Sequence, residues 1–128
     1  MGKILIVDDD KTYSTALSNN IKLYYPLLQV EVCNEPLKAL KIIRKKGIDL
    51  LVIDLEMPMI DGMKIFQFAS KIGIDKNRII ILSGRDADYL HEHFPLGTCL
   101  AVLNKFESKQ QAVLDMIFSS LQKKAQVG

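Results

Sequence analysis

The chain has 128 residues, of which 48% are hydrophobic and 25% charged, and its formal net charge is +2. This length allows one domain with a full hydrophobic core, and the composition excludes an intrinsically disordered chain. The apolar runs are far shorter than the roughly 20 residues that cross a bilayer, and the near-neutral charge argues against direct nucleic-acid binding.

The N-terminal third alternates between an apolar run and a segment of helical period. Residues 3–7 predict a strand, and apolar side chains spaced near 3.6 residues predict a helix over 13–24 that Pro26 ends. Residues 28–32 predict a second strand. Only four apolar residues precede the first aspartates, too few for a secretory signal, so we expect a cytoplasmic protein.

The middle of the chain repeats this alternation. Pro36 suits a helix's first turn and predicts a helix over 36–47, followed by a buried strand over 48–53 and a helix over 62–72. Basic residues of the 36–47 segment are interpreted as its solvent-facing side: Lys41, Arg44, Lys45 and Lys46.

The C-terminal third adds two more strand and helix pairs. Strands are predicted over 79–82 and 100–103, and helices over 86–93 and 108–121, the last with a capping box completed by Gln111. Five alternating pairs predict an α/β fold of the (βα)5 type, a parallel sheet between two helical layers. We expect residues 1–128 to form one domain, without an output domain.

Several strands end in a residue suited to phosphate chemistry. Asp8 and Asp9 follow the first strand, Asp54 the third, Ser83 the fourth and Lys105 the fifth. In an open parallel sheet the carboxyl ends of the strands share one edge, so these side chains are expected to converge. Neighbouring carboxylates repel one another unless a cation lies among them, and Mg²⁺ prefers such oxygen ligands. The pattern therefore predicts a magnesium site beside a phosphate site.

The segments that carry these residues resemble the receiver domain of two-component response regulators. The resemblance covers nearly the whole chain, and its most specific part is residues 54–62, with Met57-Pro58 and Asp61-Gly62 in the family's spacing. It implies a flavodoxin-like fold with a five-stranded sheet in the order 2-1-3-4-5. It also implies a phosphoacceptor regulatory domain rather than an enzyme, although such a domain assists its own phosphorylation and dephosphorylation.

The resemblance assigns a role to each polar residue at the phosphate site. Asp54 would be the nucleophile that accepts a phosphoryl group and forms an acyl phosphate. Lys105 would pair with one phosphoryl oxygen, and Ser83 would donate a hydrogen bond to another. Because these charges are positioned before reaction, they would lower the barrier electrostatically.

The implied cofactor is Mg²⁺. Asp9, Asp54 and the backbone carbonyl of Glu56 would hold the ion, and Asp8 would act through a metal-bound water. The implied partners are a sensor histidine kinase or a histidine phosphotransfer protein and a downstream protein target or separate output domain. The resemblance implies neither nucleic acid nor membrane as a direct partner, and either a monomer or a phosphorylation-dependent dimer.

Two other functions remain open from the sequence. A pseudo-receiver would keep the fold but signal by binding, without phosphorylation. Residues 8–12 also fit the D-x-D-x-T nucleophile motif of haloacid-dehalogenase-type phosphatases, in which Asp8 would be the nucleophile. The phosphatase hypothesis does not explain residues 54–62, and only Glu107 and Asp115 follow Lys105 as acidic residues.

The chain departs from the receiver pattern at several positions. Val102 replaces the usual aromatic residue, Phe106 replaces proline after the lysine, and Gly84 replaces alanine. We therefore expect phosphorylation to be read out through the loop before the fourth helix rather than at residue 102. We also hypothesise a salt bridge between Glu56 and Arg85 that shields the acyl phosphate.

The histidines and cysteines outside this pattern are given no chemistry. His91 and His93 are two residues apart on a predicted helix and are expected to face solvent. Cys33 and Cys99 lack metal-ligand spacing and are expected to be core residues.

Overall fold

A computed structural model describes residues 2–45 and 47–127 and confirms the predicted α/β fold. One parallel sheet runs in the order β2-β1-β3-β4-β5, the flavodoxin-like order. Its strands are β1 (Lys3–Val7), β2 (Gln29–Cys33), β3 (Leu50–Asp54), β4 (Ile79–Ser83) and β5 (Ala101–Asn104). The helices are α1 (Lys11–Tyr24), α2 (Pro36–Arg44), α3 (Gly62–Lys71), α4 (Ala87–His93) and α5 (Ser108–Val127), with a 3₁₀ turn η1 (Lys76–Arg78) before β4.

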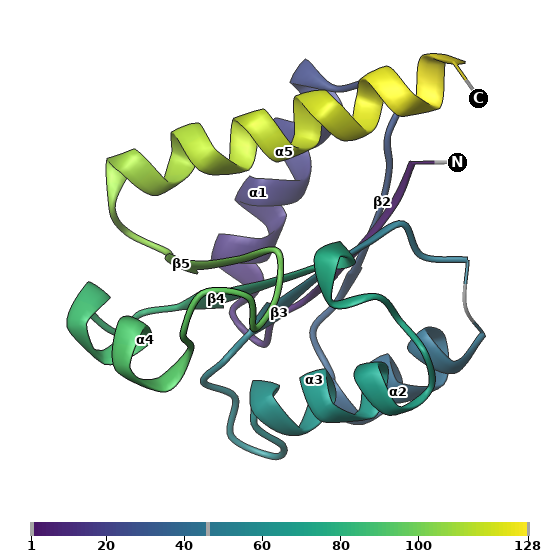
Figure 1. Ribbon diagram of the computed structural model, residues 1–128. Coiled ribbons are helices and arrows are strands. Elements are labelled where there is room, and N and C mark those ends of the chain that lie inside the picture. The colour runs from purple at the N-terminus through teal and green to yellow at the C-terminus, as the bar shows by residue number, and fades with distance from the viewer. Residues whose placement is uncertain (1, 46, 128) are drawn as a thin grey trace.

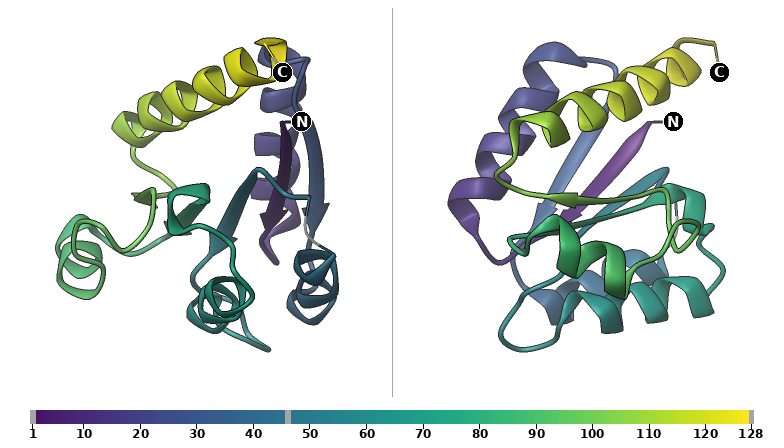
Figure 2. Two further views of the ribbon diagram at one scale, coloured as in Figure 1. Left: turned by 45° about the vertical axis from the view of Figure 1, so that its right-hand side comes forward. Right: turned by 60° about the vertical axis from the view of Figure 1, so that its left-hand side comes forward.

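Helices cover both faces of the sheet. Helices α1 and α5 lie on one face, and α2 and α3 lie side by side on the other, with α4 beside the β5 edge (Figures 1 and 2). Because both faces are covered, β3 and β4 are buried along their whole lengths. Alternate residues of β3 therefore serve different cores: Leu50 and Val52 pack with Phe118 of α5, and Leu51 and Ile53 pack toward α2 and α3.

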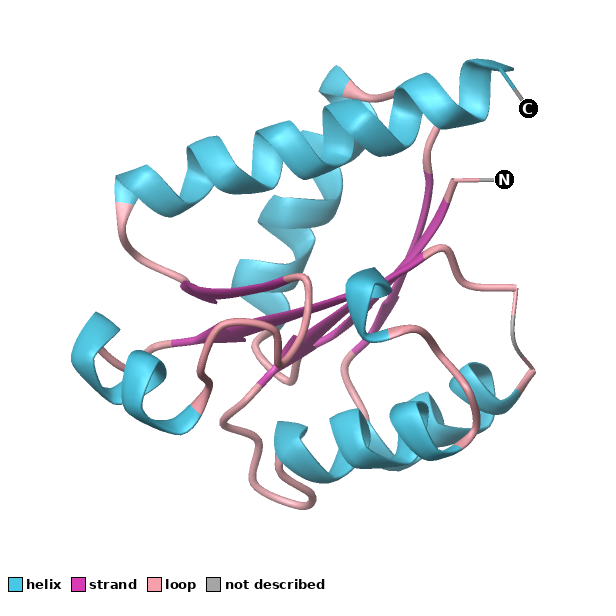
Figure 3. Cartoon of the chain, viewed as in Figure 1, coloured by secondary structure: helices cyan, strands magenta, loops and turns pink. Residues whose placement is uncertain are grey.

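Three helices begin at an aspartate that caps the first turn. The side chains of Asp10, Asp61 and Asp86 each accept a hydrogen bond from a backbone N–H three residues later, which satisfies a donor that has no partner within the helix. These aspartates end the loops that follow the carboxyl ends of β1, β3 and β4, and Figure 3 shows such loops joining strands to helices. The caps fix the loops that carry the polar residues at these strand ends.

Strands β1 and β4 begin where predicted, whereas β2, β3 and β5 begin one or two residues later. Strand β2 begins at Gln29, because the N–H of Leu28 instead closes a turn onto the carbonyl of Tyr25 at 3.0 Å. Strand β3 begins at Leu50, since the carboxylate of Asp49 accepts hydrogen bonds from the N–H groups of Gly2 and Lys3 at 2.7 and 2.9 Å. Strands β4 and β5 likewise extend to Ser83 and to Asn104.

Three predicted helix ends are also corrected. Helix α2 ends at Arg44 rather than at Gly47, and α4 starts after its Asp86 cap. The capping box predicted for α5 was wrong, because the side-chain amide of Gln111 donates to Asp115 at 3.3 Å and Ser108 lies within the helix.

The residues expected to face solvent do so. His91 and His93 are exposed, as are Lys41, Arg44 and Lys45, whereas Lys46 lies outside the described residues. Cys33 is buried and Cys99 is half-buried, both as free thiols. Within the described part of the chain, no helix is both long enough and apolar enough to cross a membrane.

Candidate functional site

The carboxyl edge of the sheet brings together the acidic and basic residues predicted to meet there. Asp8 follows β1, Asp54 ends β3, and these two strands are hydrogen-bonded neighbours in which Val7 pairs with Ile53. Lys105 follows β5 and reaches across β4 to both carboxylates. Its ammonium lies 2.7 Å from Oδ2 of Asp8 and 3.3 Å from Oδ1 of Asp54.

This ion-pair cluster is shielded from water. The side chains of Asp8, Asp54 and Lys105 are 1%, 4% and 7% exposed. A backbone N–H also donates to each carboxylate: Asp10 to Asp8 at 2.9 Å and Glu56 to Asp54 at 3.4 Å. One ammonium thus balances two buried carboxylates, which leaves excess negative charge at the site.

The excess charge shifts the protonation equilibria of the cluster. Burial, and secondly the negative charge of Asp8, raise the pKa of Asp54 to about 7 from 3.8, although Lys105 acts in the opposite direction. Burial alone would lower the pKa of Lys105, but its hydrogen bonds and charge interactions with the two aspartates outweigh burial and raise that pKa. The lysine therefore stays an ammonium, and the aspartate pair favours binding a second cation.

The carboxylates of Asp8, Asp9 and Asp54 fit a magnesium ion. One oxygen from each residue lies within 4.8 Å of the other two, and Asp9 is exposed, so the cluster opens to solvent on one side. Hard carboxylate oxygens are the ligands that Mg²⁺ prefers, and a bound dication would offset both the burial of Asp54 and its repulsion by Asp8, which together raise its pKa. The role of the Glu56 carbonyl as a further ligand stays a prediction.

Lys105 is held in place by residues for which no role was predicted. Its ammonium lies 4.7 Å from the centre of the Tyr13 ring, and that ring packs edge-to-face with the exposed Phe106. Asn104 fixes the same turn, because its side chain accepts from the N–H of Phe106 at 2.7 Å and donates to the carbonyl of Arg85 at 2.6 Å. The position of Asn104 at the end of a strand could have marked it as a site residue. Tyr13, the third residue of α1, carried no such signal.

Ser83 lies at the same edge but faces Glu56. Its hydroxyl donates to the Glu56 carboxylate, 2.6 Å from one oxygen and 3.0 Å from the other, and the N–H of Gly84 donates to that carboxylate at 3.2 Å. The hypothesised salt bridge between Glu56 and Arg85 is therefore not formed in the described part of the chain. The Arg85 guanidinium instead lies 4.5 Å from the centre of the Tyr89 ring.

The loop after Asp54 packs closely against the end of β3. Gly62 donates its N–H to the carbonyl of Leu55 at 2.9 Å, and a Cβ added to it would clash with the backbone of Asp54 and Leu55. Only glycine allows this approach, which explains the Asp61-Gly62 pair at the start of α3.

Val102 packs against an apolar cluster that includes Leu90 of α4.

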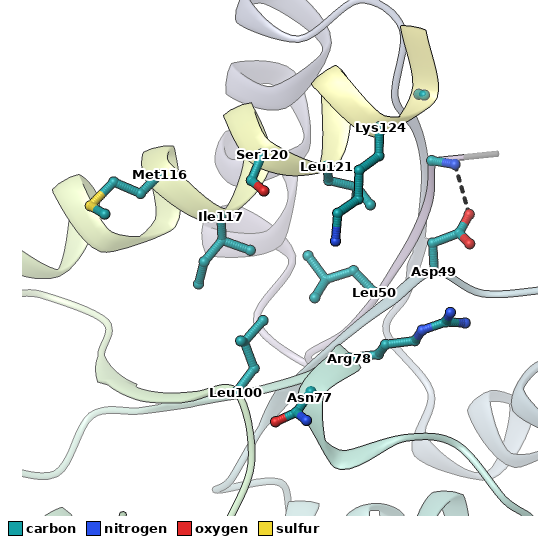
Figure 4. Close-up of a pocket in the computed structure, with 12 residues that line it drawn as sticks. Asp49, Leu50, Asn77, Arg78, Leu100, Met116, Ile117, Ser120, Leu121 and Lys124 are labelled. Carbon is teal, nitrogen blue, oxygen red and sulfur yellow. Dashed lines mark hydrogen bonds between the residues drawn. The ribbon is translucent and has the colours of Figure 1, made fainter. Parts of the chain in front are cut away.

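A separate cavity of about 390 Å³ lies under α5, at the opposite edge of the sheet. Leu50, Ile117 and Leu121 form its apolar wall, and the side chain of Lys124 extends into it from α5 (Figure 4). Asp49 at its rim is already bound to backbone N–H groups. None of the predicted site residues lines this cavity, so it is distinct from the acidic cluster.

Comparison with known proteins assigns the chain to a family. Residues 4–118 match the family model described as the response regulator receiver domain. The chain is 30% identical to response regulator MprA of Mycobacterium leprae over a match that covers 77% of this chain and 48% of the relative. The same identity and coverage of this chain hold for MprA of Mycobacterium ulcerans, of which 47% is covered. The chain thus spans about half the length of these curated relatives.

Solved structures show the same fold. The response regulator TrrA of Thermotoga maritima, solved in complex with Mg²⁺ and BeF, superposes with a TM-score of 0.76 at 21% identity, covering 94% of this chain and 99% of that chain. A CheY-like receiver domain protein of Methanospirillum hungatei gives a TM-score of 0.69 at 23% identity, covering 100% and 99%. With the family model matching residues 4–118, this chain belongs to the response regulator receiver domain family.

Proposed function

We propose that this receiver domain accepts a phosphoryl group on Asp54 in a Mg²⁺-dependent reaction and thereby changes its binding to a partner protein. The observation that carries the proposal is the convergence of Asp8, Asp9 and Asp54 around one point, with the Lys105 ammonium 3.3 Å from the acceptor carboxylate. Asp54 ends β3 at the centre of this cluster.

In the proposed reaction, a carboxylate oxygen of Asp54 attacks the phosphorus of a phosphohistidine or of a small acyl phosphate. A new oxygen–phosphorus bond forms, and the bond from phosphorus to the imidazole nitrogen or carboxylate oxygen of the donor breaks. The leaving group retains the electron pair. Hydrolysis reverses the change, because water attacks the phosphorus and releases inorganic phosphate from the restored carboxylate.

The charges of the site support this step. Asp9 and Asp54, and Asp8 through a water, would hold Mg²⁺, which would supply positive charge near the phosphoryl oxygens. The Lys105 ammonium is kept protonated by its two carboxylate partners and would pair with a phosphoryl oxygen. The protein therefore assists the reaction by positioning and electrostatics, as a regulatory domain that modifies itself.

The proposed partners follow from this chemistry and from the family. A sensor histidine kinase or histidine phosphotransfer protein would supply the phosphoryl group, and a downstream protein target or an output domain would receive the signal. We propose that these exchanges take place in the cytoplasm.

Intact-mass measurement after incubation with Mg²⁺ and acetyl phosphate tests the proposal. We expect the mass of one phosphoryl group to be added, and we expect no addition with EDTA or with Asp54→Asn. Labelling that is lost in Asp8→Asn but kept in Asp54→Asn would support the phosphatase alternative. No labelling by acetyl phosphate or by a phosphorylated phosphotransfer protein would support the pseudo-receiver.

A further inference from the structure

The carboxylate of Glu56 accepts hydrogen bonds from two donors at the end of β4. The hydroxyl of Ser83 and the N–H of Gly84 both donate to its carboxylate, at 2.6 and 3.2 Å. Ser83 is fully buried, and its oxygen also accepts from the N–H of Arg85 at 3.0 Å. The single donor proton of Ser83 is therefore used within the protein.

A phosphoryl group on Asp54 would need these donors. Asp54 lies on β3 beside β4, where it pairs with Leu82, the residue before Ser83. A hydroxyl has one proton to donate, and so has a backbone N–H. The doubly charged phosphoryl group and the Glu56 carboxylate are both acceptors and both anionic, so they compete for the same protons and repel each other.

We propose that the Glu56 carboxylate is a built-in competitor of the phosphoryl group, which must displace it from Ser83 and Gly84 when Asp54 is modified. This inference rests on the proposed function, in which Asp54 is the acceptor. It makes Glu56 a positioning residue that sets how readily the site accepts phosphate. The exchange also links modification of Asp54 to the loop before α4. This link does not need the aromatic residue that Val102 replaces.

A cavity beside Glu56 can accommodate its side chain after displacement. This cavity of about 560 Å³ lies beside Glu56, between the loop after β3 and helix α4, and Arg85, Tyr89 and His93 line its other side. The guanidinium of Arg85 over the Tyr89 ring gives the carboxylate a cation to face. The ion pair between Glu56 and Arg85 thus belongs to the phosphorylated state.

The contact itself is tested without any phosphodonor. In a ¹H–¹⁵N spectrum of the free protein, Glu56→Ala is expected to shift the Gly84 amide resonance, because its proton loses a charged acceptor. Glu107→Ala removes an exposed carboxylate near Lys105 and is the control, with no expected shift at Gly84. An unchanged Gly84 resonance in Glu56→Ala would overturn the inference.

Competition is tested by titrating the protein with beryllofluoride and Mg²⁺, the pair named in the Thermotoga structure. Glu56→Ala is expected to bind beryllofluoride about tenfold more tightly, since a hydrogen bond to a charged group no longer has to be broken. Glu56→Gln, which keeps an acceptor oxygen without the charge, should fall between the two. Glu107→Ala should bind like the wild type.

Ser83→Ala makes the test specific to the shared proton. In the wild type, this change removes a donor that was already bound to Glu56, so beryllofluoride affinity should fall little. In the Glu56→Ala background the hydroxyl is available to the ligand alone, so the same change should weaken binding about tenfold. Equal losses in both backgrounds, or no gain in Glu56→Ala, would overturn the inference alone. Absence of Asp54-dependent binding in every variant would overturn the proposed function.

Discussion

Asp54→Asn is expected to stabilise the metal-free protein at alkaline pH, although it removes the proposed phosphoacceptor. The folded protein holds the Asp54 proton up to a pKa of about 7, whereas an ordinary aspartate releases it near 3.8. The folded state therefore binds more protons than the unfolded chain between these values, and wild-type stability should decrease as pH rises through that interval. Asparagine carries no charge and removes this loss.

The size of the effect follows from the shift. Each pKa unit corresponds to about 1.4 kcal/mol, so a shift of roughly three units gives an upper bound of about 4 kcal/mol. Because the cluster opens to solvent beside Asp9, water and salt screen part of this energy, and we expect about 2 kcal/mol at pH 8. With a urea m-value of about 2 kcal/mol/M, the unfolding midpoint should rise by about 1 M.

Urea unfolding in EDTA at pH 5 and pH 8 measures this difference. The gap between Asp54→Asn and wild type should be less than half as large at pH 5 as at pH 8. Asp9→Asn is the matched control, since Asp9 is exposed and should give a smaller gain. Added Mg²⁺ should stabilise the wild type more than Asp54→Asn, because ion binding favours the folded state. A variant that is less stable than wild type at pH 8, or a gap independent of pH, would refute the reasoning.

Three further predictions concern neighbouring residues. Lys105→Met leaves two buried carboxylates without their cation, so the free energy of unfolding, measured in urea at pH 8, should fall by about 3 kcal/mol. Labelling by acetyl phosphate should also become slower. Unchanged stability would contradict the ion-pair cluster. Gly62→Ala should cost about 2 kcal/mol in the same assay, because its Cβ would meet the Asp54 backbone, and wild-type stability would argue against that packing. On binding beryllofluoride, amide resonances near Asp86 should shift more than those near Val102, and equal shifts would contradict readout through this loop.

The sequence predicted the fold and most of the candidate site because both depend on simple rules. Apolar runs between helical segments determine a parallel sheet, and such a sheet brings Asp8, Asp54 and Lys105 to one edge whatever their separation along the chain. Boundaries were less predictable because single side chains decide them. Asp49, for example, binds backbone N–H groups at the start of β1 and so precedes β3 rather than joining it.

The partner of Glu56 could not be predicted from the sequence. Opposite charge favoured Arg85. However, an exposed carboxylate can accept hydrogen bonds from any donor within reach, and the loop conformation after β4 determines which donors lie within reach. There, the Ser83 hydroxyl and the Gly84 N–H point to one place, whereas the planar guanidinium of Arg85 stacks on Tyr89. Hydrogen-bond direction, which sequence spacing does not reveal, decided between the two.

The ring of Tyr13 over the Lys105 ammonium makes the site optically addressable. The chain contains four tyrosines and no tryptophan, so tyrosine emission is not masked by a brighter fluorophore. The ammonium lies 4.7 Å from the ring centre, so we expect its charge to perturb the absorption and emission of Tyr13. Ion or ligand binding at the cluster of Asp8, Asp9 and Asp54 should then change the tyrosine fluorescence of the unlabelled protein, with Tyr13→Phe as the blank.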